Sequence, residues 1–197
     1  MPNTRPHPNS PRRATRCFTT LLAVGLLAGA STPVPAADSS PTAQATTIYI
    51  VRHAEKADAS RDPELSDAGH ARARSLAHVL TDAGIDAIFV TDTQRSRQTA
   101  APIAAATGLV PRQYDPGDSP ALAATILADH AGQNVLVIGH SNTLDDIAAA
   151  FGITGLSDLD ESQFDRLYLV RRSAGATTEL TPLRYGTPTG TGVINLD

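Results

Sequence analysis

Two arginines and two histidines have the chemistry needed to bind and attack a phosphoryl group. They are Arg52, His53, Arg95 and His140. Arginine offers fixed, bidentate donors to phosphate oxygens, and a neutral imidazole can attack phosphorus and carry the phosphoryl group covalently. If the fold brings these side chains together, they form a pocket for a dianion such as phosphate. This chemistry requires no metal ion.

Each of these side chains follows, directly or within a few residues, an apolar run that predicts a buried strand. The predicted strands at 47–51, 85–90, 109–114 and 135–138 alternate with predicted helices at 66–84, 95–106, 120–130 and 143–151. This alternation indicates a doubly wound α/β domain. Ligands of such sheets bind outside the carboxyl ends of the strands, so we expect the four side chains to meet there.

The expected fold class is α/β, with a single three-layer domain built on a mostly parallel sheet flanked by helices. Two closing strands are predicted at 166–172 and 177–185, and the short segment between them indicates an antiparallel hairpin at the sheet edge. We expect the domain to span residues 47–185. A flexible lead-in is expected at 38–46, and a loose tail at 186–197.

The first 37 residues have the three-part layout of a secretory signal peptide. Residues 1–16 contain four arginines and no acidic residue, residues 17–30 are uncharged and largely apolar, and residues 31–37 end in small side chains. The apolar core is shorter than the roughly 20 residues of a membrane-spanning helix. We therefore expect export to the periplasm or the medium after cleavage near Asp38, with an uncleaved anchor as the alternative.

Cleavage would change the charge of the protein. The precursor has 16 basic and 20 acidic residues, and loss of the four leader arginines would leave 12 basic residues and a formal net charge of −8. Electrostatic binding to nucleic acid needs a basic face, so we expect no nucleic-acid partner and no membrane association of the mature chain. Because Cys17 is the single cysteine, the mature chain would have neither a disulfide nor a thiol nucleophile.

Four segments resemble, in order, the motifs of the histidine phosphatase superfamily, also called the phosphoglycerate mutase-like family. The segments are Val51-Arg52-His53-Ala54-Glu55, Leu65-Ser66-Asp67-Ala68-Gly69, the block 91–100 with its Arg95-Ser96-Arg97-Gln98-Thr99-Ala100, and Gly139-His140 after an apolar strand. Together they span residue 48 to about residue 150. The resemblance implies the α/β fold named above and an enzyme that needs no cofactor.

The resemblance also implies a role for each matched residue. His53 matches the nucleophile that becomes phosphohistidine, and Arg52, Arg95 and His140 match the positions that hold the phosphate. The implied activity is metal-independent hydrolysis of phosphomonoesters. The substrate is a small phosphorylated molecule or a phosphoprotein. A catalytically silent protein that binds an anion or a partner on the same fold is the alternative, as is a phosphomutase.

The proton donor for the leaving group departs from the family pattern. Many branches place a glutamate in the loop after the third strand, but here that loop has only Asp115 and Asp118. Other branches use an aspartate after the second histidine, where this chain has Ser141. We favour Asp118, and Asp115 and Glu55 stay open. Three further side chains are candidates for the rim of the pocket: Asn142, Arg97 and Lys56.

Two other kinds of site deserve a test on the same residues. The segment 139–143 follows a buried strand as a hydrolase nucleophile elbow would, but no histidine follows His140 to complete a triad. A metal site made of His53, Glu55 and His140 would place both arginines beside a cation that they repel. The sequence therefore favours an anion site over either alternative.

Overall fold

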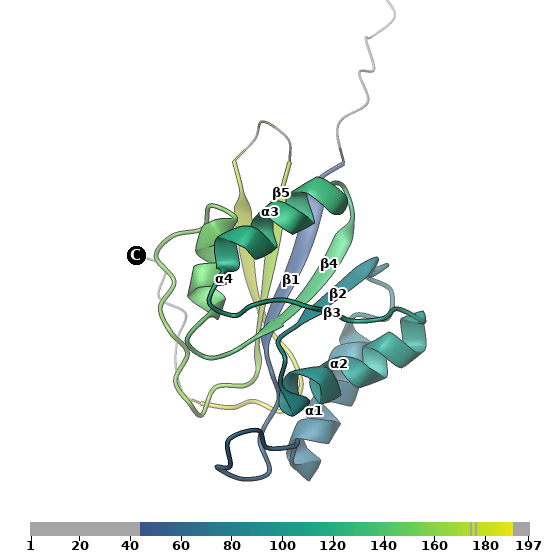
Figure 1. Cartoon of the computed structure of the whole chain (residues 1–197), viewed down its shortest axis with the longest axis vertical. Coiled ribbons are helices and arrows are strands. Elements are labelled where there is room, and N and C mark those ends of the chain that lie inside the picture. The colour runs from purple at the N-terminus through teal and green to yellow at the C-terminus, as the bar shows by residue number, and fades with distance from the viewer. Residues whose placement is uncertain (1–43, 174, 176, 191–197) are drawn as a thin grey trace, which may run out of the picture. The chain divides into compact units, whose positions relative to one another are not determined.

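A computed structural model of the protein describes residues 44–173, 175 and 177–190 (Figure 1). Its strands are β1 (Thr46–Arg52), β2 (Ala87–Val90), β3 (Arg112–Gln113), β4 (Asn134–Gly139), β5 (Arg166–Arg172) and β6 (Glu179–Arg184). They form one sheet in the order β3-β2-β4-β1-β5-β6. The first four strands pair in parallel, whereas β5 is antiparallel to both β1 and β6. The predicted mostly parallel sheet with an antiparallel edge hairpin is confirmed.

The pairing of β1 with β4 brings the two histidine motifs together. Arg52 lies opposite Gly139 in the register of these parallel strands. The ladder continues one step further, because the amide of His53 donates to the carbonyl of Gly139 at 3.0 Å. His53 and His140 therefore leave the sheet side by side, at the carboxyl ends of its two central strands.

Four helices cover the two faces of the sheet. They are α1 (Asp67–Val79), α2 (Gln94–Thr107), α3 (Ser119–Asp129) and α4 (Leu144–Ala150). Figure 1 shows α3 and α4 in front of the sheet and α1 and α2 on its other side. Strand residues alternate between the two cores: Ile48 and Ile50 pack toward α3 and α4, while Val51 packs toward α1 and α2. This is the expected three-layer arrangement.

Residues at the helix ends explain where α1 begins and where α2 ends. Ser66 accepts a hydrogen bond from the amide of Gly69 and so caps α1, as predicted. Gly108 ends α2 in the left-handed conformation, with φ of 74°. The predicted end of α1 at Gly84 is wrong. The helix stops at Val79, and Gly84 instead has φ of 60° in the turn before β2.

The third strand is much shorter than the predicted run 109–114. β3 contains two exposed residues at the edge of the sheet, paired with Phe89 and Val90 of β2. Pro111 precedes it and has no amide hydrogen to donate to a neighbouring strand. At the other edge, Pro182 lies in the middle of β6, opposite Tyr168 of β5.

Residues 186–190 are held in place, which differs from the loose tail that the sequence suggests. The carbonyl of Thr187 accepts a hydrogen bond from Arg72 at 2.8 Å. The hydroxyl of Thr189 accepts bonds from the amides of Phe164 and Asp165. The rest of the tail, the predicted signal peptide 1–37 and residues 38–43 of the predicted lead-in lie outside the described residues.

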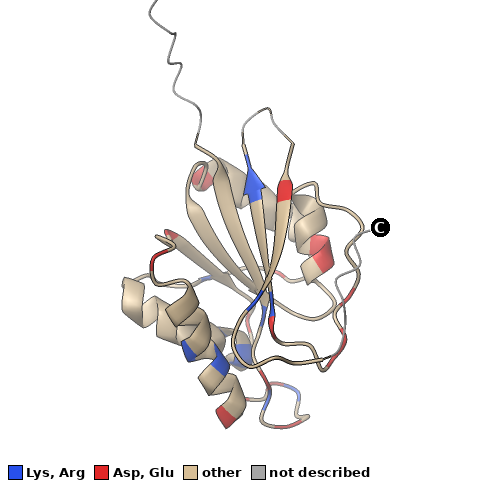
Figure 2. Cartoon of the chain, turned by 180° about the vertical axis from the view of Figure 1, so that it is seen from behind, with Lys and Arg blue, Asp and Glu red and all other residues tan. Residues whose placement is uncertain are grey.

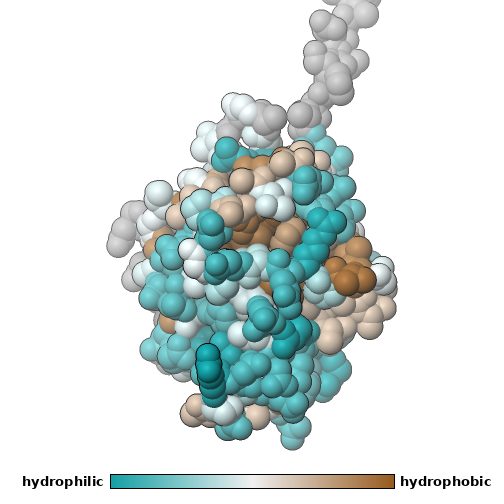
Figure 3. All heavy atoms as spheres, viewed as in Figure 1, coloured by the Kyte–Doolittle hydropathy of each residue, from teal (hydrophilic) through white to brown (hydrophobic). Residues whose placement is uncertain are grey.

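Polar and charged residues are prominent on the faces seen in Figures 2 and 3. Figure 2 shows charged residues around the end of the sheet where β1 finishes, and hydrophilic residues cover most of the face seen in Figure 3. Among the described residues, the large hydrophobic side chains that are exposed are Val79, Val110 and Leu183. In the part of the chain that the structure describes, no helix is both long enough and apolar enough to cross a membrane.

Candidate active site

A pocket of about 440 Å³ opens at the carboxyl ends of β1 and β4. The lining residues are Arg52, His53, Lys56, Arg95, Pro116, Gly117, His140, Ser141, Asn142, Thr143 and Glu161. All four side chains proposed from the sequence to handle phosphate are among them, and so are the rim candidates Asn142 and Lys56. Arg97 is not, because it forms an ion pair with Asp92 away from the pocket.

His53 is held with one ring nitrogen free. Its Nδ1 lies 2.8 Å from the carbonyl oxygen of Ala54. A carbonyl can only accept, so Nδ1 carries the hydrogen and Nε2 keeps its lone pair. The residue is only 3% exposed. This tautomer is the one that a nucleophilic histidine needs if it attacks through Nε2.

Burial keeps both histidines of the pocket uncharged. It lowers the pKa of His53 to about 3, with further contributions from the positive charges of Arg52 and Arg95. Burial and the same two arginines lower the pKa of His140 to about 4. Desolvation and nearby like charge both disfavour the protonated imidazole. At neutral pH, His53 is therefore a neutral ring with an available lone pair.

His140 faces His53 across the pocket. The ring centroids are 5.3 Å apart, with an angle of 63° between the planes. The Nε2 atom of His140 lies 3.0 Å from the hydroxyl of Thr91, which follows β2. The amide of His140 donates to the hydroxyl of Thr143 at 3.0 Å. The first contact orients the ring, and the second holds the backbone that carries it.

Arg52 is almost completely buried and firmly anchored. Its Nη1 donates to the carbonyls of Asp160, Glu161 and Gln163, each at 3.1 Å. The guanidinium carbon lies 4.1 Å from the ring centre of Phe164, as in a cation–π contact. Burial lowers the pKa of Arg52, but an arginine stays charged at neutral pH. The positive charge is therefore fixed beside His53.

Two buried donors at the pocket have no partner within the described part of the chain. They are the Nε atoms of Arg52 and Arg95. Arg95 lies in the first turn of α2, where the helix N-terminus adds to its attraction for anions, and its Nη1 is 3.7 Å from Asp62. A buried N–H without a partner is unfavourable. An oxyanion in the pocket would supply the missing acceptor.

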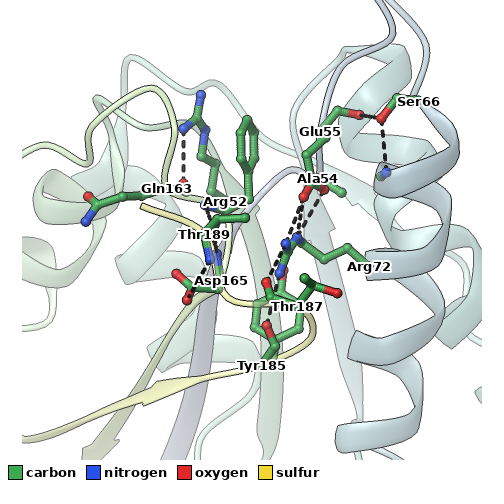
Figure 4. Close-up of polar contacts among 12 residues, drawn as sticks. Arg52, Ala54, Glu55, Ser66, Arg72, Gln163, Asp165, Tyr185, Thr187 and Thr189 are labelled. Atoms are coloured by element: carbon green, nitrogen blue, oxygen red, sulfur yellow. Dashed lines mark hydrogen bonds and ion pairs between the residues drawn. The ribbon is translucent and has the colours of Figure 1, made fainter. Parts of the chain in front are cut away.

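The segment after His53 is packed tightly against α1. A Cβ atom on Gly69 would lie 2.3 Å from the carbonyl oxygen of Glu55, which explains the glycine of the second motif. Figure 4 shows Arg72 of α1 reaching toward Glu55, Tyr185 and Thr187. The Arg72 guanidinium binds both carboxylate oxygens of Glu55 at 2.8–3.0 Å.

The structure does not bring the three expected proton donors to the pocket. The carboxylate of Asp118 caps α3 by accepting from the amide of Ala121 at 3.0 Å. Asp115 accepts from the amide of Gly117 at 2.8 Å, and Glu55 is paired with Arg72. None of the three is among the pocket-lining residues. Each carboxylate has a local structural partner, which the sequence spacing alone did not reveal.

Glu161 is the pocket carboxylate that sequence reasoning missed. Its Oε2 lies 2.8 Å from Nη2 of Arg52, and its Oε1 accepts from the hydroxyl of Ser141 at 2.6 Å. Glu161 belongs to the acidic connector between α4 and β5, far from any strand end in the sequence. Only the fold places it beside Arg52, so no local motif could have marked it.

The described residues do not assemble an evident metal site. Within the ranges 44–173 and 177–190, no group of three or more His, Cys, Asp or Glu side chains lies close enough together to hold a metal ion. The pocket presents two arginines instead. Its charge suits an anion.

The comparisons with known proteins agree with this site. Residues 48–117 match a family model described as histidine phosphatase superfamily (branch 1). This segment contains Arg52, His53 and Arg95, and it ends before the His140 motif. A search of functionally curated proteins found no match.

Similar solved structures share the fold at low sequence identity. The protein histidine phosphatase SixA complexed with tungstate aligns with a TM-score of 0.58 and 19% identity, over 70% of this chain and 96% of that one. Mycobacterial hydrolase 1 aligns with a TM-score of 0.57 and 16% identity, over 70% and 97%. Mycobacterial glucosyl-3-phosphoglycerate phosphatase aligns with a TM-score of 0.52 and 16% identity, over 65% and 91%.

The sequence motifs, the sheet order and the site geometry agree with these findings. The match to the family model covers most of β1, His53 after it, and the helix that carries Arg95. The alignments to solved structures extend over nearly the whole of those chains. Residues 48–117 of this chain thus resemble the histidine phosphatase superfamily in sequence, and the chain shares the fold of these solved structures.

Proposed function

We propose that the protein is a phosphatase that hydrolyses phosphomonoesters through a phosphohistidine on His53, without a metal ion. One observation carries the proposal. His53 is neutral and buried, has a lone pair on Nε2, and lines the same pocket as Arg52 and Arg95. The buried Nε atoms of both arginines have no acceptor among the described residues. An oxyanion with an electrophilic phosphorus would satisfy both features at once.

The first step is transfer of the phosphoryl group to the enzyme. The Nε2 lone pair of His53 attacks phosphorus, the bond from phosphorus to the ester oxygen breaks, and the departing oxygen takes up a proton. Arg52 and Arg95 donate hydrogen bonds to the equatorial oxygens, where negative charge develops, and His140 does the same when its Nδ1 carries a proton. Donors placed for such charge are usually the largest contribution to catalysis.

The second step releases inorganic phosphate. A water molecule attacks the phosphorus of the phosphohistidine, the bond between phosphorus and nitrogen breaks, and the electron pair returns to Nε2 of His53. The hydrogen bond from Nδ1 to Ala54 keeps the ring in one orientation through both steps. The free enzyme is then restored for another turnover.

The substrate is a phosphorylated small molecule or a phosphoprotein, and phosphohistidine-bearing proteins deserve an early test. One structurally similar protein is named as a protein histidine phosphatase, and another as a glucosyl-3-phosphoglycerate phosphatase. These names suggest a starting panel of a phosphohistidine protein, sugar phosphates and phosphoglycerates. Release of inorganic phosphate by the purified mature chain would identify the preferred class.

Trapping of the covalent intermediate tests the mechanism. Rapid quench with labelled substrate should place the label on the peptide that contains His53, in a bond stable to alkali and labile to acid. His53→Ala should abolish the label and turnover, while the exposed His78→Ala should retain both. Label that passes only to a second substrate would indicate a phosphomutase. Tight anion binding without any label would indicate a silent binding protein.

Export is part of the proposed function. The positive leader and short apolar core at residues 1–37 suggest that the protein acts on phosphoesters outside the cytoplasm. N-terminal sequencing of protein from the periplasm or the medium should find a start near Asp38. Soluble cytosolic protein that begins at Met1 would contradict this part of the proposal.

A further inference from the structure

We infer that Glu161 transfers the proton to the departing oxygen and later recovers one from the attacking water. This inference rests on the proposed phosphohistidine mechanism and supplies the group that the mechanism lacks. The departing ester oxygen needs a proton, and a positioned carboxyl group is one of the usual donors. Glu161 is the one carboxylic acid among the residues that line the pocket of the described structure.

The position of Glu161 is determined by contacts at both of its carboxylate oxygens. One oxygen binds Nη2 of Arg52 at 2.8 Å, and the other accepts from Ser141 at 2.6 Å. Ser141 directly follows His140, so the carboxylate lies between the end of β4 and the arginine of β1. Its backbone carbonyl also accepts from Nη1 of Arg52, so the backbone stays anchored even if the carboxylate leaves its partners.

The other candidate carboxylates are occupied elsewhere. Glu55 is bound by Arg72 of α1 through three hydrogen bonds, and its backbone is packed against Gly69. Asp115 accepts from the amide of Gly117 in the loop before α3. Asp118 accepts from the amide of Ala121 in the first turn of α3. Moving any of these carboxylates into the pocket would break a local structure. Moving Glu161 breaks only its contacts within the pocket.

In the free enzyme Glu161 is ionised, because the hydrogen bond from Ser141 and the charge of Arg52 lower its pKa. Substrate binding changes this environment. The incoming phosphoryl oxygens compete for Arg52, and their negative charge favours the protonated form of a neighbouring carboxyl group. The side chain of Glu161 is 73% exposed, so it can move off Arg52. A substrate that binds as its monoanion brings the proton that Glu161 then holds.

The proton transfers balance over one turnover. In the first step the protonated carboxyl of Glu161 gives its proton to the ester oxygen as that oxygen leaves phosphorus. In the second step the resulting carboxylate takes a proton from water as its oxygen bonds to phosphorus. Glu161 then returns this proton to the departing phosphate, which leaves as a monoanion, so the carboxylate is ionised again when the next monoanionic substrate binds.

The experiment compares two substrates that differ in their need for an acid. The departing group of para-nitrophenyl phosphate is stable as an anion, whereas that of an alkyl phosphate must be protonated. Rapid quench measures the rate of phosphoenzyme formation, so hydrolysis of the phosphohistidine in the second step does not affect the result. Glu161→Gln should slow phosphorylation by the alkyl phosphate on the order of 10²–10⁴-fold and leave phosphorylation by para-nitrophenyl phosphate nearly unchanged.

Three further variants sharpen the test. Glu161→Asp keeps a carboxyl group and should recover part of the alkyl phosphate rate. Glu179→Gln, the same change on the exposed end of β6, should behave like the unaltered protein. Asp118→Asn keeps a side-chain oxygen that can cap α3, and it should show no dependence on the substrate's departing group.

Other outcomes would overturn the inference. If Glu161→Gln accelerated both substrates and tightened phosphate binding, Glu161 would be only a competitor for Arg52. An equal loss with both substrates would mean that Glu161 only orients Arg52, and a selective loss in Asp118→Asn would assign the proton to Asp118. Absence of any phosphoenzyme in the unaltered protein is a separate result, because it would contradict the phosphohistidine mechanism itself.

Discussion

The hydroxyl of Thr99 accepts a hydrogen bond from the amide of Ala54 at 2.9 Å, and it donates one to the carbonyl of Arg95 at 2.7 Å. One buried side chain thus joins the segment after His53 to the helix that carries Arg95. Ala54 in turn holds Nδ1 of His53. Thr99 therefore helps to position the His53 ring relative to Arg95.

Thr99→Val should impair both stability and catalysis. Valine has a similar shape but leaves the buried amide of Ala54 without a partner, which should destabilise the fold by about 1–3 kcal/mol. A small shift of His53 should also lower kcat by up to about 10²-fold. Denaturant unfolding and phosphatase assays would measure the two effects. Thr125→Val is a matched control, because its exposed hydroxyl also bonds to a carbonyl one helical turn back.

Arg95→Ala should reduce kcat on the order of 10²–10³-fold, with little change in stability, because it removes a donor to the developing charge. Arg97→Ala is the natural comparison. It lies two residues further along α2, is more exposed, and pairs with Asp92 outside the pocket. Steady-state kinetics should show near-normal turnover for Arg97→Ala. Equal losses in the two variants would mean that general positive charge matters more than the Arg95 contact.

The two pocket histidines should make the fold less stable in acid. Their pKa values are about 3 and about 4 in the folded protein and near 6.5 in the unfolded chain. Below pH 6.5 the unfolded state therefore binds more protons, so stability falls as the pH drops toward 4. The double variant His53→Asn, His140→Asn should lose less thermal stability over this range than the unaltered protein. His78→Asn should follow the unaltered protein.

Gly69→Ala should destabilise the protein and slow the phosphatase. The added carbon would lie 2.3 Å from the carbonyl oxygen of Glu55, so α1 or the segment after His53 must shift. Overpacking of this kind costs typically about 1–3 kcal/mol, and the shift should lower the rate of phosphoenzyme formation. Thermal unfolding and rapid quench would measure the two effects. Arg74→Ala, on the exposed side of α1, should change stability by no more than about 0.5 kcal/mol.

Chelators and oxyanions should have opposite effects on activity. EDTA should leave turnover unchanged, since the proposed chemistry uses side chains alone and Arg52 and Arg95 would repel a cation. Vanadate or tungstate should inhibit competitively by accepting hydrogen bonds from the same arginines. Phosphatase activity measured at increasing concentrations of each reagent would test both expectations. Loss of activity in EDTA with recovery on added zinc or magnesium would instead support a metal-dependent mechanism.

The central strands and their strand-end residues were predictable because their signals are local. The run 135–138 forms most of β4, and the polar residues that follow it reach the pocket as expected. Ser66 and Gly108 mark helix ends by backbone rules that depend on few neighbours. The early end of α1 depends on how the chain packs in the turn before β2. The shortness of β3 depends on its place at the edge of the sheet. Neither is visible in local periodicity.

The carboxylates near the pocket show more clearly which features could not be predicted from the sequence. Asp115 and Asp118 stand in the expected loop but bond to nearby amides, which a linear sequence leaves open. Glu161 reaches the pocket because the connector before β5 returns across the end of β1, where Arg52 binds three of its carbonyls. That return is a long-range contact. It follows from the antiparallel addition of β5 and not from any spacing along the chain.

The two edges of the sheet also bear on how the protein behaves at high concentration. An exposed strand edge is a template for pairing with another molecule. Here one edge is β3, with only two residues, and the other is β6, where Pro182 interrupts the row of amide donors. An incoming strand would find few bonds at either side. Resistance to edge-to-edge aggregation is therefore built into the sheet, which suits a protein that must fold without the support of a disulfide.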